Sequence, residues 1–374
     1  MMPLARGFLP EIDPLDLLPE ACSAWQECAN ELPKLLVSDL FHNRLLQLPT
    51  FAVSCLKTER ELERAMQILS YLGHAYVWTM KKPPQTLPEI LARPWYEIGQ
   101  KLNRPPVLSY ASYALHNWKR LDPNRPIELG NIVLIQNFLG GVDEEWFILV
   151  HVDIEAKAAS GLNAAFEAIK AAKSGNCDAL TVSLKQVQQS LEQMCKTLLR
   201  MPEKCDPYIY YHRVRPYIHG WKNHPSFPNG LIYEGVYDNK PQQFRGETGA
   251  QSTIIPTFDA LFGITHSPDE LYHYLQQMRN YMPESHRAFL HFVETNSVVR
   301  AFIRDHQTPK LKELYNSCIL LLDRFRKIHL GYAASYIQKQ HQMSEGNPNA
   351  VGTGGTPFMQ YLQKHEQETT AFLL

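Results

Sequence analysis

The sequence lacks any uninterrupted apolar run of about 18 residues, the length that a helix needs to cross a bilayer. Its first residues, Met1 to Pro19, lack the basic start and apolar stretch of a signal peptide. An excess of charge is also missing, because 37 Lys and Arg nearly balance 38 Asp and Glu. Non-specific binding to nucleic acid or to an anionic membrane is therefore disfavoured. We expect a cytoplasmic protein with a neutral small molecule as its partner.

Metal-binding spacings are scarce. The seven cysteines are scattered and form no C-x-x-C pair, so we interpret them as reduced, mostly buried thiols. The sequence has no H-E-x-x-H motif and no two histidines four residues apart. It has one Glu-x-x-His, Glu270 to His273, whereas a di-iron bundle needs two copies and two further glutamates. These absences argue against a zinc or non-haem iron site.

Helical periodicity dominates the chain. Apolar residues recur every three or four positions in Glu59–Trp78 and in Asp178–Leu199, which predicts two amphipathic helices. Helix-start signals follow further along; the first is interpreted as a capping box with proline at the first helical position. These signals are Ser267-Pro268-Asp269-Glu270, Thr308-Pro309 and Thr356-Pro357. The pattern predicts an all-α fold.

The helical pattern breaks between Asp122 and Gly141. This stretch holds a proline-rich turn, a short β-like run from Ile132 to Ile135, and a Gly-Gly pair. We place a domain boundary there, between a small, mostly helical domain with minor β structure (1–139) and a large helical bundle domain (140–374). The alanine-rich stretch Asp143–Ala172 is predicted to be the central helix of the bundle.

Two of the 15 histidines fall on apolar helix faces. His329 continues a stripe at steps of three and four residues: Leu311, Leu314, Cys318, Leu322, Phe325, His329, Tyr332 and Tyr336. His151 lies four residues after Phe147 and three before Ile154, on an otherwise apolar and aromatic face. A histidine inside a core needs partners for its ring nitrogens. Either both are ordinary hydrogen-bonded core residues, or they face each other across a haem pocket.

Two glycine-rich segments stand between helices. Gly352–Thr356 follows a polar run rather than a strand and has no following Lys-Ser or Lys-Thr, so it is a poor phosphate loop. A mobile lid over residues 342–356 and a plain flexible connection remain open alternatives. The second segment, Arg245–Ser252, leads into the apolar stretch Ile254–Ile264, which contains Asp259.

Taken together, these motifs resemble the indoleamine 2,3-dioxygenase family. Tyr274–Phe289 is similar to a family signature almost residue for residue. Further similar stretches follow in the family's order: Arg104–Trp118, Arg215–Trp221, Leu231–Gly235 and Gly352–Thr356. The resemblance covers the chain from about residue 70 to its end and is weakest at the N-terminus.

The resemblance implies a small N-terminal domain over the distal side of a large all-helical domain that binds haem b, active as Fe²⁺. It places the proximal iron ligand at His329, in agreement with the stripe. It also aligns Arg326 with a family arginine expected to pair with an aspartate, here Asp259, and to brace the proximal helix. A surface salt bridge is the alternative for that pair.

The resemblance also implies a substrate site. Arg215 aligns with an arginine that grips the tryptophan carboxylate, a role that suits a forked guanidinium. Thr353 and Gly249 lie in loops near the amino acid end of the substrate. The aromatic positions that would wall the indole, or would otherwise be ordinary core, are Tyr110, Phe147, Tyr210 and Tyr211, of which the last two replace family phenylalanines.

The chain departs from the family pattern at two positions. Where animal members have a distal serine, this chain has His151, as related tryptophan 2,3-dioxygenases do, so the resemblance is to a bacterial-type member with a distal histidine. That histidine is expected to accept a hydrogen bond from the indole N–H. The family's Gly-Gly-Ser-Ala-Gly-Gln-Ser-Ser is here Gly246–Thr253 with Glu247 at a glycine position. Glu247 either binds the substrate ammonium or turns outward to solvent.

The sequence thus predicts a haem-dependent oxidoreductase that inserts O2 across the indole C2–C3 bond of L-tryptophan or a related indoleamine. The product would be N-formylkynurenine, at the first step of tryptophan catabolism by the kynurenine pathway. One alternative is a haem-binding or indole-binding homologue with another substrate or no turnover. A helical protein without haem is a third, disfavoured by His329 and His151. We expect a monomer or weak homo-oligomer.

Overall fold

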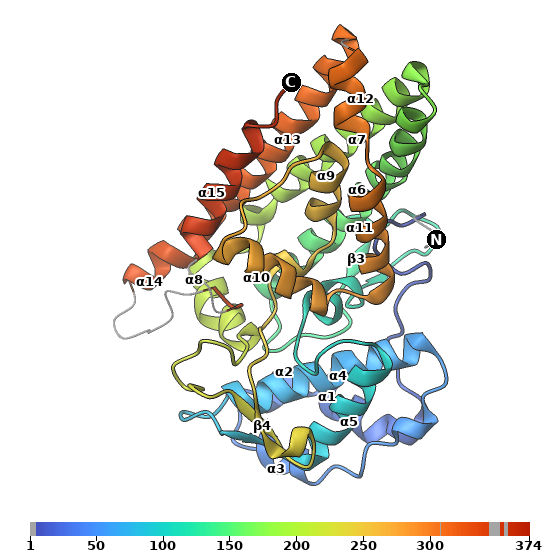
Figure 1. The fold of residues 1–374 in the computed structure, drawn as a ribbon. Coiled ribbons are helices and arrows are strands. Elements are labelled where there is room, and N and C mark those ends of the chain that lie inside the picture. Colours follow the sequence, from blue (N-terminus) through green and yellow to red (C-terminus); the bar gives the residue numbers. More distant parts are fainter. Residues whose placement is uncertain (1–4, 307, 344–351, 355–357) are drawn as a thin grey trace.

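The computed structural model describes residues 5–306, 308–343, 352–354 and 358–374. Over these residues the fold is almost entirely helical, as the periodicity predicted, and includes two small sheets. Short N-terminal helices pack below a group of longer helices (Figure 1). No helix in the described ranges combines the length and the apolar character needed to cross a bilayer.

The smaller part of the molecule is built around α4 (Glu59–Trp78), which matches the predicted span. Thr58 caps this helix in a reciprocal capping box: its hydroxyl accepts the Glu61 N–H, and the Glu61 carboxylate accepts the Thr58 N–H. Most of α4 is buried. The helices around it are α1 (Ser23–Asn30), α2 (Leu32–Leu35), α3 (Phe41–Leu46) and α5 (Glu89–Lys101).

The two sheets are short. The first has the order β1 (Thr86–Leu87), β4 (Leu231–Tyr233) and β5 (Pro241–Gln242), with β1 and β4 parallel and β4 and β5 antiparallel. The second pairs β2 (Lys119–Arg120) with β3 (Ile132–Val133) in antiparallel fashion. The β-like run expected over Ile132–Ile135 is thus a strand only in its first half. The first sheet ties a segment after residue 230 to the N-terminal helices.

The larger part is a bundle of long helices. Its centre is α6 (Val142–Lys173), which runs beside α7 (Cys177–Leu198), and α13 (Pro309–Ala333) packs on α7. Gly161 lets α6 approach its neighbours, because a β-carbon there would lie 2.6 Å from Ser190 Oγ and 3.0 Å from Phe258. The remaining helices are α8 (Pro207–Ile209), α9 (Ile254–Phe262), α10 (Glu270–Met278), α11 (Glu284–Asn296), α12 (Val299–His306), α14 (Lys339–Met343) and α15 (Phe358–Thr370).

The helix-start signals are only partly as predicted. The capping box at Ser267 is wrong: Asp269 is the N-cap of α10 and accepts the Tyr272 N–H at 3.0 Å, so Pro268 precedes the cap. The Asp269 carboxylate lies closer to the first turn than the Ser267 hydroxyl and accepts its free N–H group. The Ser267 hydroxyl donates to Glu368. Pro309 does begin α13, but the hydroxyl of Thr308 makes no cap bond. Thr356-Pro357 lies outside the described residues.

The interior contains two apolar cores. One joins the N-terminal helices, and the other fills the helical bundle from Phe8 and Trp146 to Tyr336. The first core also takes in Ile218 to Val236 and Leu271 to Tyr281, so the chain returns to it twice after α6 begins. The first core contains residues from both sides of residue 139, so the domain boundary there remains a prediction.

Candidate functional site

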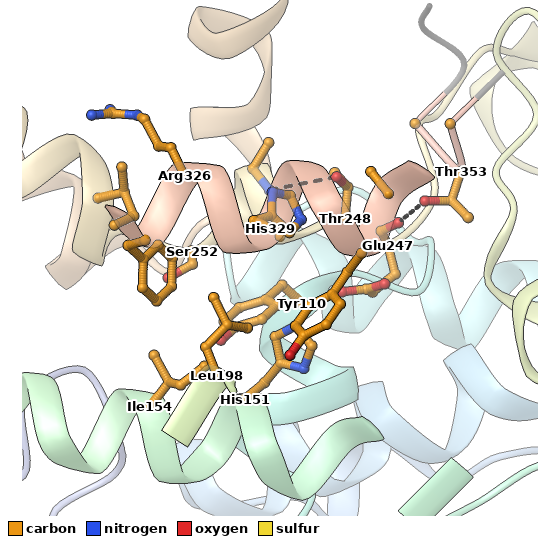
Figure 2. Close-up of a pocket in the computed structure, with 18 of the residues that line it drawn as sticks. Tyr110, His151, Ile154, Leu198, Glu247, Thr248, Ser252, Arg326, His329 and Thr353 are labelled. Carbon is orange, nitrogen blue, oxygen red and sulfur yellow. Dashed lines mark hydrogen bonds between the residues drawn. The ribbon is translucent and has the colours of Figure 1, made fainter. Parts of the chain in front are cut away.

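A cavity of about 300 Å³ lies between α13 on one side and α6 on the other (Figure 2). Most of its wall is apolar, including Ile154, Met194, Leu198, Ile254, Leu271, Leu275, Phe325, Ala333 and Ile337. The loop segments 247–250 and 352–354 close one end. The cavity brings together these predicted site residues: Tyr110, Phe147, His151, Tyr210, Gly249, Arg326, His329 and Thr353.

His329 projects from α13 into this cavity. Its side chain lies deep in the protein and yet is exposed, because it faces the hollow rather than packed neighbours. Neither ring nitrogen forms a hydrogen bond with a residue that the structure describes. Burial, with a smaller contribution from nearby His151, lowers the pKa of His329 to about 4, so the imidazole is neutral at pH 7. A hydrogen-bonded core histidine, the alternative reading, is therefore wrong here.

His151 projects from α6 on the opposite wall (Figure 2). Its Nδ1 lies 2.7 Å from the Phe147 carbonyl oxygen, which can only accept, so Nδ1 carries the hydrogen. Burial lowers the pKa of His151, which keeps the ring neutral. Nε2 is consequently a hydrogen-bond acceptor, and no described residue occupies it.

Aromatic rings cover the wall around His151. The Phe147 ring lies 4.7 Å from the imidazole and 4.5 Å from the Tyr210 ring, and Tyr110 lies edge-on at 6.0 Å. Tyr210 begins a π-helical turn, Tyr210–Val214, and the Tyr336 ring packs against it at 5.9 Å. At these distances the rings contact one another, so they form one aromatic wall of the cavity, a surface that suits a planar aromatic ligand.

Sequence reasoning missed a buried polar cluster behind Tyr110. The Tyr110 hydroxyl donates to Glu155 Oε1 at 3.0 Å, and Ser252 Oγ donates to the same oxygen at 2.8 Å. The Tyr110 N–H donates to Gln251 Oε1 at 2.9 Å. Burial raises the pKa of Glu155 to about 7. Its place one helical turn after His151 was the available signal, because residues i and i+4 share a helix face.

Arg326 and Asp259 form the ion pair that the resemblance predicted. Arg326 Nη2 donates to Asp259 Oδ1 and Oδ2 at 2.8 and 2.6 Å, and Nη1 donates to Thr369 Oγ1 at 2.8 Å. Both side chains are buried, so the surface-salt-bridge alternative is wrong. Despite the opposing effect of burial, Arg326 and His266 lower the pKa of Asp259 to about 2. The pair ties α13 to α9 one turn before His329.

The two glycine-rich segments contact each other. Thr353 Oγ1 donates to the Glu247 carbonyl oxygen at 2.5 Å, and the Gly220 N–H donates to the Thr353 carbonyl oxygen at 3.3 Å. Arg245 Nη1 donates to the Gly354 carbonyl oxygen, and its guanidinium lies 4.9 Å from the Tyr274 ring. Residues 352–354 are thus bonded in place. The rest of the predicted lid, apart from 342–343, lies outside the described residues.

Glu247 turns into the cavity, so the alternative in which it points to solvent is wrong. Its side chain is 4% exposed and lines the hollow beside Thr353 (Figure 2). The carboxylate forms no hydrogen bond with any described residue, and burial raises its pKa to about 8.

Arg215 and Tyr211 are not among the residues that line the cavity. Arg215 is buried, with its guanidinium 5.3 Å from the Tyr211 ring centre. The Tyr211 hydroxyl lies 3.3 Å from His341 Nδ1. Both residues lie in the turns directly after Tyr210. The expected direct contact of Arg215 with a ligand remains a prediction.

The cavity residues fit a haem. A neutral imidazole with a free nitrogen is the form of histidine that binds iron, and His329 presents one toward an apolar hollow. Arg326 adds a buried cation at the same helix. The fold and site therefore define a helical protein with a histidine-walled pocket of the kind that binds haem.

Comparison with known proteins makes this class specific. The family model described as indoleamine 2,3-dioxygenase matches residues 3–372. The chain is 36% identical to rat indoleamine 2,3-dioxygenase 1, covering 96% of this chain and 92% of the relative. It is 34% identical to human indoleamine 2,3-dioxygenase 2 (98% and 93%) and 33% to the yeast indoleamine 2,3-dioxygenase (98% and 91%). The chain belongs to the indoleamine 2,3-dioxygenase family.

Proposed function

We propose that the protein is a haem-dependent dioxygenase that converts L-tryptophan and O2 to N-formylkynurenine. The observation that carries this proposal is the placement of His329 and His151 on opposite walls of one apolar cavity. The reaction breaks the indole C2–C3 bond and places one atom of O2 on each carbon. No other co-reactant is consumed, which suits a site with few charged groups.

His329 would ligate the iron of haem b, and the pair of Arg326 with Asp259 would brace its helix. Ferrous haem, when bound, supplies the activation of O2. The protein positions the substrate and excludes water. Because neither histidine has to be charged, the low pKa values of both agree with this division of work.

The remaining residues would bind the substrate. Phe147, Tyr110 and Tyr210 would form the aromatic wall against which the indole stacks. Tyr211 would contribute through the turn that it shares with Tyr210. His151 Nε2, the open acceptor, would receive the indole N–H. Three groups are assigned to the amino acid end of the substrate: Arg215 for the carboxylate, and Thr353 and Gly249 beside it. Because Arg215 is not among the described residues that line the cavity, its contact would require a movement of its side chain or of the turn that carries it.

The outer properties of the protein are part of the same proposal. We assign residues 1–139 to a small domain over the distal side and residues 140–374 to the haem-binding domain. The protein is expected in the cytoplasm as a monomer or weak homo-oligomer. The bacterial-type assignment rests on His151 alone.

The proposal is tested by the absorbance of N-formylkynurenine when reduced, haem-loaded protein meets L-tryptophan and O2. We expect product from the natural protein, no haem Soret band in His329→Ala, and a smaller loss of rate in His151→Ala. His306→Ala is a matched control, since His306 is exposed and its Nδ1 also lies near the carbonyl four residues earlier. A Soret band without product would instead favour a haem-binding or indole-binding homologue, for which Glu247 is the supporting feature. A missing Soret band in the natural protein would overturn the haem assignment.

A further inference from the structure

Glu247 is the only carboxylate among the described residues that line the cavity. The same described residues include one guanidinium, Arg326, which is already bonded to Asp259 and Thr369. When Glu247 ionises, no cation among these residues balances its charge.

The position of Glu247 is fixed by its main chain. Its N–H donates to the Ile218 carbonyl oxygen at 3.1 Å, and its own carbonyl oxygen accepts the Thr353 hydroxyl. The preceding residue, Gly246, packs against Gly220 so closely that a β-carbon on either would clash with the backbone nitrogen of the other. With both flanks held, the side chain is directed inward.

The side chain reaches the aromatic end of the cavity. In Figure 2 it extends from its contact with Thr353 toward the region of Tyr110 and His151. Burial raises the pKa of Tyr110 and Tyr210, and the nearby charge of Glu247 adds a smaller increase in both. A group bound next to the aromatic wall would thus lie within reach of this carboxylate.

A buried carboxylate without a hydrogen-bond donor is costly, and proteins seldom retain one without a partner. In Glu247 the exposed fraction is 4% and burial raises the pKa to about 8, so the unliganded group largely keeps its proton at neutral pH. A cationic ligand would remove this cost, because it supplies both the opposite charge and N–H donors. The residue is thus prepared for a positively charged group that enters with the ligand.

We propose that Glu247 binds the ammonium group of the substrate and so selects indoles that carry a primary amine. The inference rests on the proposed function and names the substrate class of that same site. L-Tryptophan and tryptamine both carry the ammonium, whereas indole-3-propionate has the indole and carboxylate without it. The site should therefore distinguish these three compounds by charge rather than by ring shape.

The test is calorimetric titration of haem-loaded protein with L-tryptophan, tryptamine and indole-3-propionate. Glu247→Gln keeps the shape and removes the charge, and so reproduces a neutral acid. We expect it to weaken binding of L-tryptophan and tryptamine roughly tenfold or more, the usual effect of a charge-assisted hydrogen bond. Binding of indole-3-propionate should be unchanged or stronger. Glu167→Gln, which removes the same charge at an exposed position of α6, serves as the control.

Two results would overturn the inference. One is unchanged affinity of Glu247→Gln for both amines. The other is equal weakening of all three compounds, which would indicate a structural role for the side chain. Product formation by the natural protein is measured separately, so either proposal can fail while the other holds. A protein that binds amines through Glu247 but makes no N-formylkynurenine would contradict the proposed function and support the inference.

Discussion

The backbones of Gly220 and Gly246 pack directly against each other, so that a β-carbon on either residue would clash with the backbone nitrogen of the other. The contact joins the turn after Ile218 to the loop that carries Glu247. It explains why glycine stands at both positions, although neither has a positive φ angle. Close approach, rather than backbone freedom, is the requirement here.

Gly246→Ala should separate these two segments. We expect a loss of about 1–3 kcal/mol in the free energy of unfolding, the usual cost of overpacking, together with a higher KM for L-tryptophan. Chemical denaturation and steady-state kinetics measure the two effects. Gly331→Ala is the control: no atom lies within 4 Å of its β-carbon, and alanine favours a helix, so stability should stay equal or rise. A Gly246→Ala protein as stable as the natural one would contradict the packing argument.

The hydrogen bond proposed for His151 can be isolated by changing the substrate. His151→Ala should lower kcat/KM for L-tryptophan roughly tenfold, because one hydrogen bond to the bound indole is lost. With 1-methyl-L-tryptophan, which has no indole N–H, the substitution should have little effect. The two ratios are compared at equal haem content. An equal loss with both substrates would show that His151 acts by shape alone.

Asp259 should control stability in acid. Its folded-state pKa of about 2 lies below the ordinary value of 3.8, so its contribution is complete above pH 4 and disappears as the pH falls toward 2. Asp259→Asn should lose about 3 kcal/mol near neutral pH, because Arg326 stays buried without its charged partner. Thermal unfolding from pH 2 to pH 7 should show a smaller acid decrease in this variant. Parallel curves of stability against pH for the natural protein and Asp259→Asn would contradict the low pKa assigned to Asp259.

Glu155 should have the opposite pH dependence. Its folded-state pKa of about 7 lies above the ordinary value of 4.5, so its contribution is present below pH 4.5 and is lost as the pH rises through 7. Between pH 4.5 and pH 7 the folded protein binds up to one more proton at Glu155 than the unfolded chain does. Glu155→Gln should therefore remove about 3 kcal/mol from the loss of stability over this pH range. Part of the dependence of stability on pH remains in this variant, because Glu144 and Glu247 also have raised pKa values. The measurement is the free energy of unfolding from chemical denaturation between pH 5 and pH 8, with Glu167→Gln as the control. An unchanged pH dependence in Glu155→Gln would contradict the assignment.

Local sequence pattern predicted the helices and the two histidines well. The span of α4 follows from its apolar spacing and its capping box, and both are properties of adjacent residues. His329 and His151 were found because each interrupts an apolar face, and a helix fixes the direction of its side chains. Where neighbours along the chain determine the structure, the sequence was sufficient.

What the sequence left open or misassigned lies where distant segments determine the outcome. The inward turn of Glu247 depends on Gly220 and on Thr353, which are far from it in the sequence. The position of Arg215 relative to the cavity, where its contact with a ligand stays a prediction, depends on the irregular turns after Tyr210, which no periodic pattern describes. The cap of α10 was misassigned because Ser267 is used by Glu368 of another helix.

The contact between Thr353 and Glu247 also concerns how the protein is made. His151 leaves the ribosome long before His329, and Thr353 and Gly354 follow later still. A nascent chain can therefore fold its N-terminal helices and form α6 while one end of the cavity has not yet been synthesised. A haem that enters before translation has passed Gly354 would meet a cavity whose wall still lacks this contact.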